Sequence, residues 1–167
     1  MGEHRMNKCP GCGAVLPDTD GPTHRYMTSS PACYAHFNAL LAHEYSDATL
    51  TPVHRLTVDT FAIQHPGDQT TRQQIQSVGL HLARLGRQLQ RKMGPAETND
   101  VMLDLGKHKH TLVALTPPAR FSMTVVDVAP FAGTDHHAEK VRAWAEATWA
   151  DWSAHHAYIE AWVAKWQ

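Results

Sequence analysis

Three cysteines within the first 33 residues are the strongest constraint on how this chain can fold. Cys9 and Cys12 belong to a Cys-Pro-Gly-Cys-Gly segment, and Cys33 follows in the same region. Two thiolates that flank a tight Pro-Gly turn can face the same cation, which is how structural zinc sites begin. The segment from Cys9 to Ser30 is rich in proline and glycine, so a metal is needed to order it. The pattern predicts a zinc site with Cys9, Cys12 and Cys33 as ligands.

The chain has 167 residues and suits one domain, 1–167, with a zinc-knuckle segment at 9–36 and a helical body at 37–167. The net charge of −1 gives no sign of a nucleic-acid or membrane partner, so a small-molecule ligand or a protein partner fits better. There is no apolar run of about 18 residues, and the start MGEHRMNK lacks a signal-peptide core. We expect a cytoplasmic protein, where free thiols are favoured over disulfides.

Start and stop signals and apolar spacing predict a mostly α fold. Ser30 followed by Pro31 is a helix start, and a stripe from Ile75 to Leu89 marks the clearest helix. Helices are predicted over 31–45, from 51 to the stop at His65-Pro66-Gly67, and over 70–92, 101–107, 124–131 and 135–166. Residues 1–8 are expected to be frayed. The predicted architecture is a single-domain assembly of four to six helices with a zinc knuckle at its N-terminal end.

Two histidines compete to be the fourth ligand of the predicted zinc site. His36 follows Cys33 by three residues, so the two would share a helix face. His24 lies in the intervening loop, from which a side chain can also reach the metal. Spacing alone slightly favours His36.

The chain contains thirteen histidines, far more than one structural site can use. His54 and His65 would lie on one side of the second predicted helix, and His81 borders the apolar stripe of the third. A helical bundle that gathers histidines from facing helices can build a metal site with open positions. We therefore predict a second, histidine-based metal or catalytic site with these candidate members: His54, Asp59, His65, His81 and His155 or His156.

Such a site has two chemical variants. An open metal position would lower the pKa of a bound water and make it a nucleophile, whereas a metal-free site would use one histidine as general base. Gln64 and Gln76 would then orient a substrate. The alternative is that each histidine is a core residue satisfied by one hydrogen bond.

Two further patterns are more typical of structure than of chemistry. Arg84, Arg87 and Arg91 line one face of the third predicted helix, which a solvated surface explains. The tryptophans near the C-terminus are spaced as a core or an interface requires: Trp144, Trp149, Trp152, Trp162 and Trp166. The chain has no phosphate-binding glycine loop, dinucleotide fingerprint or nucleophile elbow.

Five ordered segments of the chain resemble a bacterial family of small proteins that is known only as a domain of unknown function. They are CPGCG, DGPTHRYMTSSPACY, VHRLTVDTFAIQHPG, IQSVGLHLARL and VRAWAEATWADWSAHH, and they span about residues 9–165. The resemblance implies no activity. It favours His24 over His36 as the fourth zinc ligand.

Two functional hypotheses follow. In the first, the knuckle stabilises the fold and the interior histidines form a pocket, as in a metal-dependent enzyme acting on a small molecule. In the second, the chain is a non-enzymatic, zinc-stabilised interaction module whose tryptophan-rich C-terminal helix docks on a partner or on a second copy, as in a homodimer. A helical-bundle thiol transferase with a three-histidine metal centre is a third alternative by analogy of architecture alone, since its usual spacing is not visible here.

Overall fold

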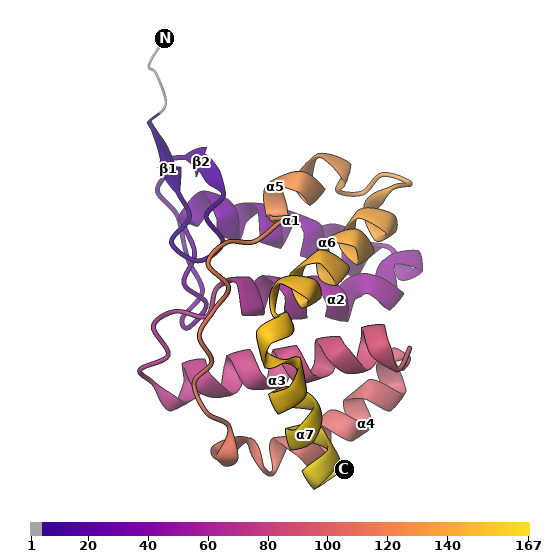
Figure 1. The fold of residues 1–167 in the computed structure, drawn as a ribbon. Coiled ribbons are helices and arrows are strands. Elements are labelled where there is room, and N and C mark those ends of the chain that lie inside the picture. The colour runs from indigo at the N-terminus through magenta and orange to yellow at the C-terminus, as the bar shows by residue number, and fades with distance from the viewer. Residues whose placement is uncertain (1–4) are drawn as a thin grey trace.

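The computed structural model describes residues 5–167 and shows a helical body with a small two-stranded sheet near its N-terminal end (Figure 1). Strands β1 (Met6–Lys8) and β2 (Val15–Pro17) pair antiparallel, with Asn7 opposite Leu16. The predicted frayed start is therefore wrong where β1 forms, and residues 1–4 lie outside the described range. The hairpin holds the Cys-Pro-Gly-Cys turn at its tip.

The remaining elements are helical, which confirms the predicted mostly α fold class. Within residues 5–167, six helices exceed one turn and a seventh, α5, has four residues: α1 (Pro31–Ser46), α2 (Thr51–Gln64), α3 (Arg72–Gln90), α4 (Pro95–Gly106), α5 (Val125–Val128), α6 (His137–Asp151) and α7 (His156–Trp166). Four 3₁₀ turns join them: η1 (Ala48–Leu50), η2 (Lys109–Thr111), η3 (Ala129–Phe131) and η4 (Ser153–His155). None of the helices in this range is both long and apolar enough to cross a bilayer.

The helix starts are encoded by local capping residues. The Ser30 hydroxyl accepts a hydrogen bond from the Cys33 backbone N–H, 3.3 Å away, and so caps α1. Thr71 and Gln74 form a capping box that starts α3. These caps satisfy N–H groups that have no partner within the helix.

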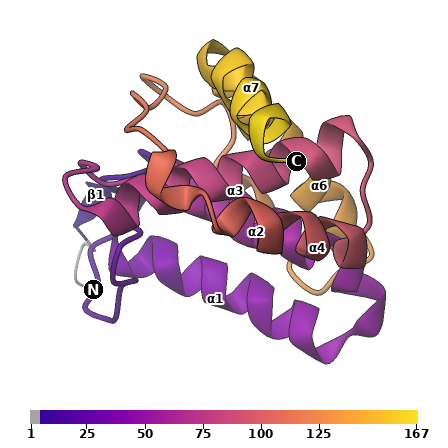
Figure 2. The same cartoon turned by 90° about the horizontal axis from the view of Figure 1, so that it is seen from below.

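Helix α2 lies at the centre of the body and packs against α1, α3 and α6 (Figures 1 and 2). Most of its residues are buried, and among them are the polar side chains of Thr57, Asp59, Thr60 and Gln64. Gln64, which was predicted to orient a substrate, instead donates to the carbonyl oxygen of Met123 and to Thr148, and so joins α2 to α6. The buried side chains of Thr57, Asp59 and Gln64 therefore meet partners from neighbouring helices, whereas Oγ1 of Thr60 makes no hydrogen bond within residues 5–167.

The predicted single helix over 135–166 is wrong, because the chain bends between α6 and α7. At the bend, Nε2 of His156 donates to the carbonyl oxygen of Trp149 over 2.7 Å, and the two rings stack with centroids 3.9 Å apart. A side chain that takes a helix carbonyl in this way opens the backbone ladder. Trp152, at the bend, is fully buried, so the change of direction places an indole in the core.

Helix α4 begins at Pro95, earlier than the predicted start at 101. Gly94 and Pro95 end the preceding segment, but proline also favours the first position of a new helix. The same two residues therefore close one helix and open the next.

Candidate metal centre

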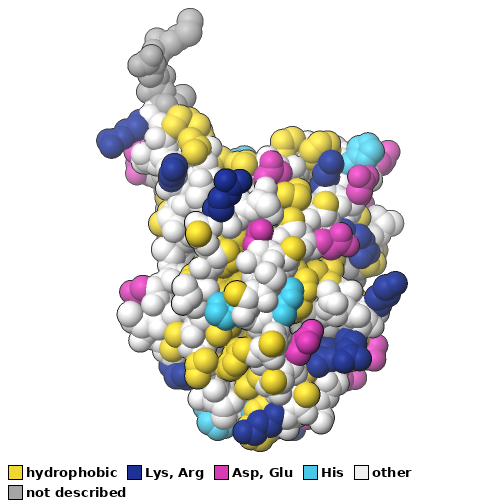
Figure 3. All heavy atoms as spheres, in the orientation of Figure 1, with side chains coloured by type: hydrophobic (Ala, Val, Ile, Leu, Met, Phe, Trp, Pro, Cys, Tyr) yellow, Lys and Arg dark blue, Asp and Glu magenta, His cyan; other side chains and the backbone are white. Residues whose placement is uncertain are grey.

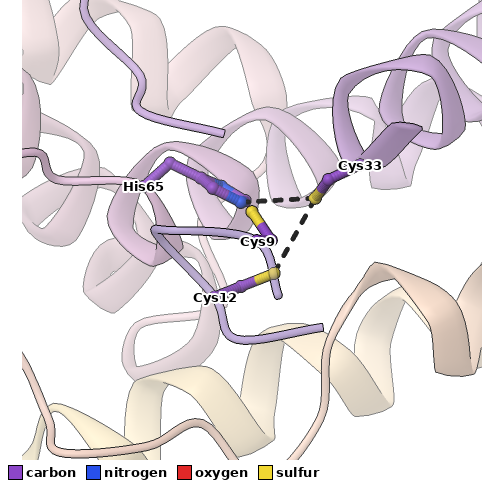
Figure 4. A group of neighbouring side chains, drawn as sticks. All are labelled: Cys9, Cys12, Cys33 and His65. Carbon is purple, nitrogen blue, oxygen red and sulfur yellow. Dashed lines mark hydrogen bonds between the residues drawn. The ribbon is translucent and has the colours of Figure 1, made fainter. Parts of the chain in front are cut away.

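Cys9, Cys12, Cys33 and His65 converge on one point at the N-terminal end of the body (Figure 4). Their ligand atoms all lie within 4.8 Å of one another. The Sγ atoms of Cys12 and Cys33 are 3.7 Å apart, and Sγ of Cys33 is 3.4 Å from Nε2 of His65. All four residues are buried and the cysteines are free thiols. This Cys₃His group can hold a metal ion.

The distances fit a tetrahedral metal. Bond lengths of about 2.3 Å from zinc to sulfur and about 2.0 Å from zinc to nitrogen give edges of about 3.8 Å between sulfurs and about 3.5 Å between sulfur and nitrogen. The observed 3.7 Å between Cys12 and Cys33 and 3.4 Å between Cys33 and His65 lie within about 0.1 Å of these edges. A disulfide would need the sulfurs about 2 Å apart. The chemistry of the donor set and its spacing therefore fit a thiophilic divalent cation.

Three separate segments supply the four ligands. Cys9 and Cys12 flank the turn between β1 and β2, where the Gly13 N–H donates to the Cys9 carbonyl over 3.0 Å and Gly13 adopts φ +79°. Cys33 lies in the first turn of α1, where the positive end of the helix dipole favours a thiolate. His65 directly follows the last residue of α2. A bound ion would therefore tie the hairpin to two helices of the body.

The ring of His65 is held in the tautomer that a metal needs. Its Nδ1 lies 2.6 Å from the carbonyl oxygen of Phe61, and because a carbonyl can only accept, Nδ1 carries the proton. Nε2 then keeps its lone pair and points at the sulfurs. A hydrogen bond from the second ring nitrogen to a backbone carbonyl is the usual support of a metal-bound histidine.

The sulfurs influence one another strongly. Hydrogen bonds from Cys12 and Cys33 lower the pKa of Cys9, whereas contact with Cys12 and Cys9, together with burial, raises the pKa of Cys33 far above its usual value. The backbone N–H of Ser30 also donates to Sγ of Cys9, over 3.4 Å. Three crowded thiolates repel one another unless a cation neutralises them, so metal binding and release of thiol protons are coupled.

The fourth member of the cluster is His65, not His24 or His36. The ring of His24 packs 4.6 Å from the Tyr26 ring, and its Nδ1 accepts from the Tyr26 backbone N–H over 3.3 Å. His36 shares α1 with Cys33 but also lies outside the cluster. Spacing favoured His36 and the family resemblance favoured His24, but the C-terminal end of α2 meets the hairpin and brings His65 to the three cysteines instead.

The other predicted members of a histidine site lie in separate places. His54 pairs with Glu44, Asp59 pairs with His81, and Nε2 of His155 donates to the Thr116 carbonyl over 2.8 Å. Within residues 5–167, the Cys₃His cluster is the one group of three or more metal-ligating side chains that meets at a point. His156 meets the Trp149 carbonyl, so the structure divides the predicted set among five environments.

Two charged residues were missed or misassigned from the sequence. Glu44 is buried and accepts from His54 over 2.9 Å, from His137 over 3.0 Å and from Thr57. Arg84, expected on a solvated face, instead binds the buried carboxylate of Asp59. A signal for Arg84 existed, since His81, Arg84 and Gln88 recur at helical spacing along one side of α3. Glu44 gave no such signal.

Comparisons with known proteins identify a family without assigning a function. Neither the curated proteins nor the solved structures provide a match. The profile of one family of unknown function, DUF5946, matches residues 7–153 and so includes the hairpin, the Cys₃His cluster and α1 to α6. This agrees with the resemblance inferred from the sequence motifs. The chain belongs to DUF5946, a family of unknown function.

Proposed function

We propose that the protein binds one zinc ion through Cys9, Cys12, Cys33 and His65, and that this zinc stabilises the fold. The observation that carries the proposal is the convergence of three sulfurs and one nitrogen within 4.8 Å of one another, with 3.7 Å between Cys12 and Cys33 and 3.4 Å between Cys33 and His65. Zinc is the cation that best matches a buried Cys₃His set, because soft thiolates favour it and such sites are four-coordinate.

The site has the character of a structural centre. All four ligands come from the protein and are buried, with exposures of 2 % for Cys9, 5 % for Cys12, 0 % for Cys33 and 1 % for His65. A catalytic zinc keeps a position open for water or substrate, whereas a closed site contributes folding energy. The ion would stabilise the contact between the hairpin, the start of α1 and the end of α2. The hairpin is too small to form an extensive core of its own.

The need for reduced thiols at this site bears on the cellular location of the protein. The three cysteines are free and close together, and they must stay reduced to bind a metal. This supports a cytoplasmic location, where thiols persist. The face in Figure 3 carries both acidic and basic side chains, and the net charge of −1 supports a small-molecule ligand rather than a nucleic acid.

The interaction-module hypothesis depends on exposed tryptophans, and the structure gives it little surface. Trp144, Trp149, Trp152 and Trp162 are all buried in the core, and only Trp166 is half-buried. A docking face on α7 would therefore have to be built from Trp166 and the side chains that share its surface hollow, among them Val113, Tyr158 and Lys165.

Elemental analysis of purified protein tests the zinc proposal. We expect about one zinc per chain in the unaltered protein and loss of the metal in Cys33→Ser. Ser153→Ala, on the exposed turn η4 away from the cluster, is the control and should retain the metal. The decisive case is protein purified with its thiols kept reduced. If this protein is folded without metal and does not take up added zinc, the proposal is wrong.

A further inference from the structure

A second group of interacting side chains surrounds the buried carboxylate of Asp59. This carboxylate is fully buried in α2. It accepts from Nε of Arg84 at 2.8 and 3.0 Å, from Nη2 of Arg84 at 2.6 Å and from Nε2 of Gln88 at 2.7 Å. Its remaining partner is Nδ1 of His81, at 2.7 Å. Burial opposes ionisation of Asp59, but the charge of Arg84 and the hydrogen bond from His81 outweigh it and lower the pKa of the carboxyl.

The ionised carboxylate determines which nitrogen of His81 is free. A carboxylate can only accept, so Nδ1 of His81 carries the proton and Nε2 keeps its lone pair. No hydrogen bond among residues 5–167 involves this Nε2 atom. The contrast is His137, whose Nδ1 accepts from the Gly133 N–H and whose Nε2 donates to Glu44. Both nitrogens of His137 are used for structure, whereas one nitrogen of His81 is not.

His81 lines an open cavity of about 270 Å³ between α3 and the segment that precedes α1. The polar lining comprises Tyr26, Gln73, Gln76, Ser77 and Lys109. These side chains offer hydroxyl, amide and ammonium donors. No carboxylate is among the lining residues, since Asp59 is enclosed behind His81. The cavity therefore presents hydrogen-bond donors and one positive charge, a combination that suits a small anion.

We propose that this cavity binds a small molecule bearing a phosphate or carboxylate group, and that Nε2 of His81, whose tautomer Asp59 fixes, accepts a hydrogen bond from a hydroxyl group of that molecule. His81 is then a binding residue, and Asp59 is a positioning residue that acts through it.

The first experiment uses diethylpyrocarbonate on the full chain in its metal-loaded form, with peptide mapping to follow each histidine. The reagent acylates an unprotonated imidazole nitrogen, so His81 should react through Nε2. His54 is the internal control, because its Nδ1 also pairs with a buried carboxylate and its side chain is 19 % exposed against 21 % for His81. His54 does not line the cavity.

Inorganic phosphate is the probe for the anion site. At ten times its dissociation constant it should slow modification of His81 roughly tenfold and leave His54 unchanged. Lys109→Met, which alters an exposed side chain, should remove most of this protection. Equal reactivity of His81 with and without phosphate at tens of millimolar, or equal protection of His54, would overturn the anion site.

The pH profile of the modification rate tests the positioning role of Asp59. The groups that face His81 are Asp59 from α2, Arg84 from α3, Lys109 from η2, and His24 and Tyr26 from the loop before α1. In Asp59→Asn the pH of half-maximal rate should fall, because the imidazolium loses its carboxylate, and Asp59→Glu should restore part of the difference. An unchanged profile in folded Asp59→Asn would refute this role. If that variant fails to fold, the Lys109→Met comparison still decides the anion site.

Discussion

Nδ1 of His65 donates to the carbonyl oxygen of Phe61 across 2.6 Å, so the imidazole closes the end of α2 while its other nitrogen faces three sulfurs. One side chain therefore satisfies a helix carbonyl that has no partner in the helix and completes the Cys₃His cluster. The end of α2 and the candidate metal site are parts of one arrangement.

His65→Ala should lose zinc and stability, whereas His24→Ala should keep both. Zinc in small structural sites supplies about 10–16 kcal/mol, so losing one of four ligands is expected to cost roughly 3 kcal/mol or more of unfolding free energy. Zinc content and the urea midpoint measure the two effects. His24 is a matched control because it lies in the adjacent loop but outside the cluster. The reverse result would restore His24 as the fourth ligand.

Gly11→Ala should destabilise the knuckle even though it removes no ligand. A Cβ at Gly11 would collide with the ring of His65 and lie 2.5 Å from the Thr28 carbonyl oxygen and 2.8 Å from that of Gln64. Overpacking of this kind costs about 1–3 kcal/mol, and it should also weaken zinc affinity in a competition with a chromogenic chelator.

Gly106→Ala is the control for this substitution. Its Cβ would meet nothing within 4 Å, and the residue ends α4. Alanine there should be neutral or stabilise the protein by up to about 1 kcal/mol. Equal thermal shifts in the two variants would show that the close approach of the turn to His65 does not matter.

Glu44→Gln should be strongly destabilising, because the carboxylate joins three helices. Gly133 donates to Nδ1 of His137, so Nε2 of His137 must donate to Glu44, and His54 donates from α2. An amide would replace one of the two oxygens by an NH₂ group, which would face the N–H of either His137 or His54, at a cost of about 2–4 kcal/mol. Denaturant unfolding measures it. Glu139→Gln, whose side chain is 69 % exposed beside His136, should change stability by less than about 0.5 kcal/mol.

The Asp59 carboxyl should titrate below the usual value for aspartate, about 3.9, because Arg84 and His81 outweigh the effect of burial on its pKa. Since the folded-state pKa is lowered, the ion pair contributes its full stability above about pH 4 and loses it as the pH falls through the folded-state value. The carboxyl ¹³C chemical shift, followed by NMR as a function of pH, gives the midpoint directly. A midpoint at or above 3.9 would contradict the arrangement.

Much of the fold could be predicted from short-range signals. Ser30 with Pro31 and the Thr71–Gln74 box mark the starts of α1 and α3, where the structure begins both helices. The bend between α6 and α7 depends on the contact of the His156 ring with the Trp149 carbonyl. The apolar spacing of the sequence continues through the bend and therefore predicts one unbroken helix. The start of α4 at Pro95 does not follow from the sequence pattern, because Gly94 and Pro95 can both end one helix and begin the next.

The sequence by itself predicted that Cys9, Cys12 and Cys33 lie together as candidate metal ligands and that helices follow them, because turn spacing, caps and apolar periodicity act over a few residues. Tertiary structure alone decided that His65 completes the cluster, that Glu44 joins His54 to His137, and that Asp59 orients His81 toward a cavity. These pairings join residues 10 to 93 positions apart. Only the packing of α2 against its neighbours brings such residues within hydrogen-bonding distance.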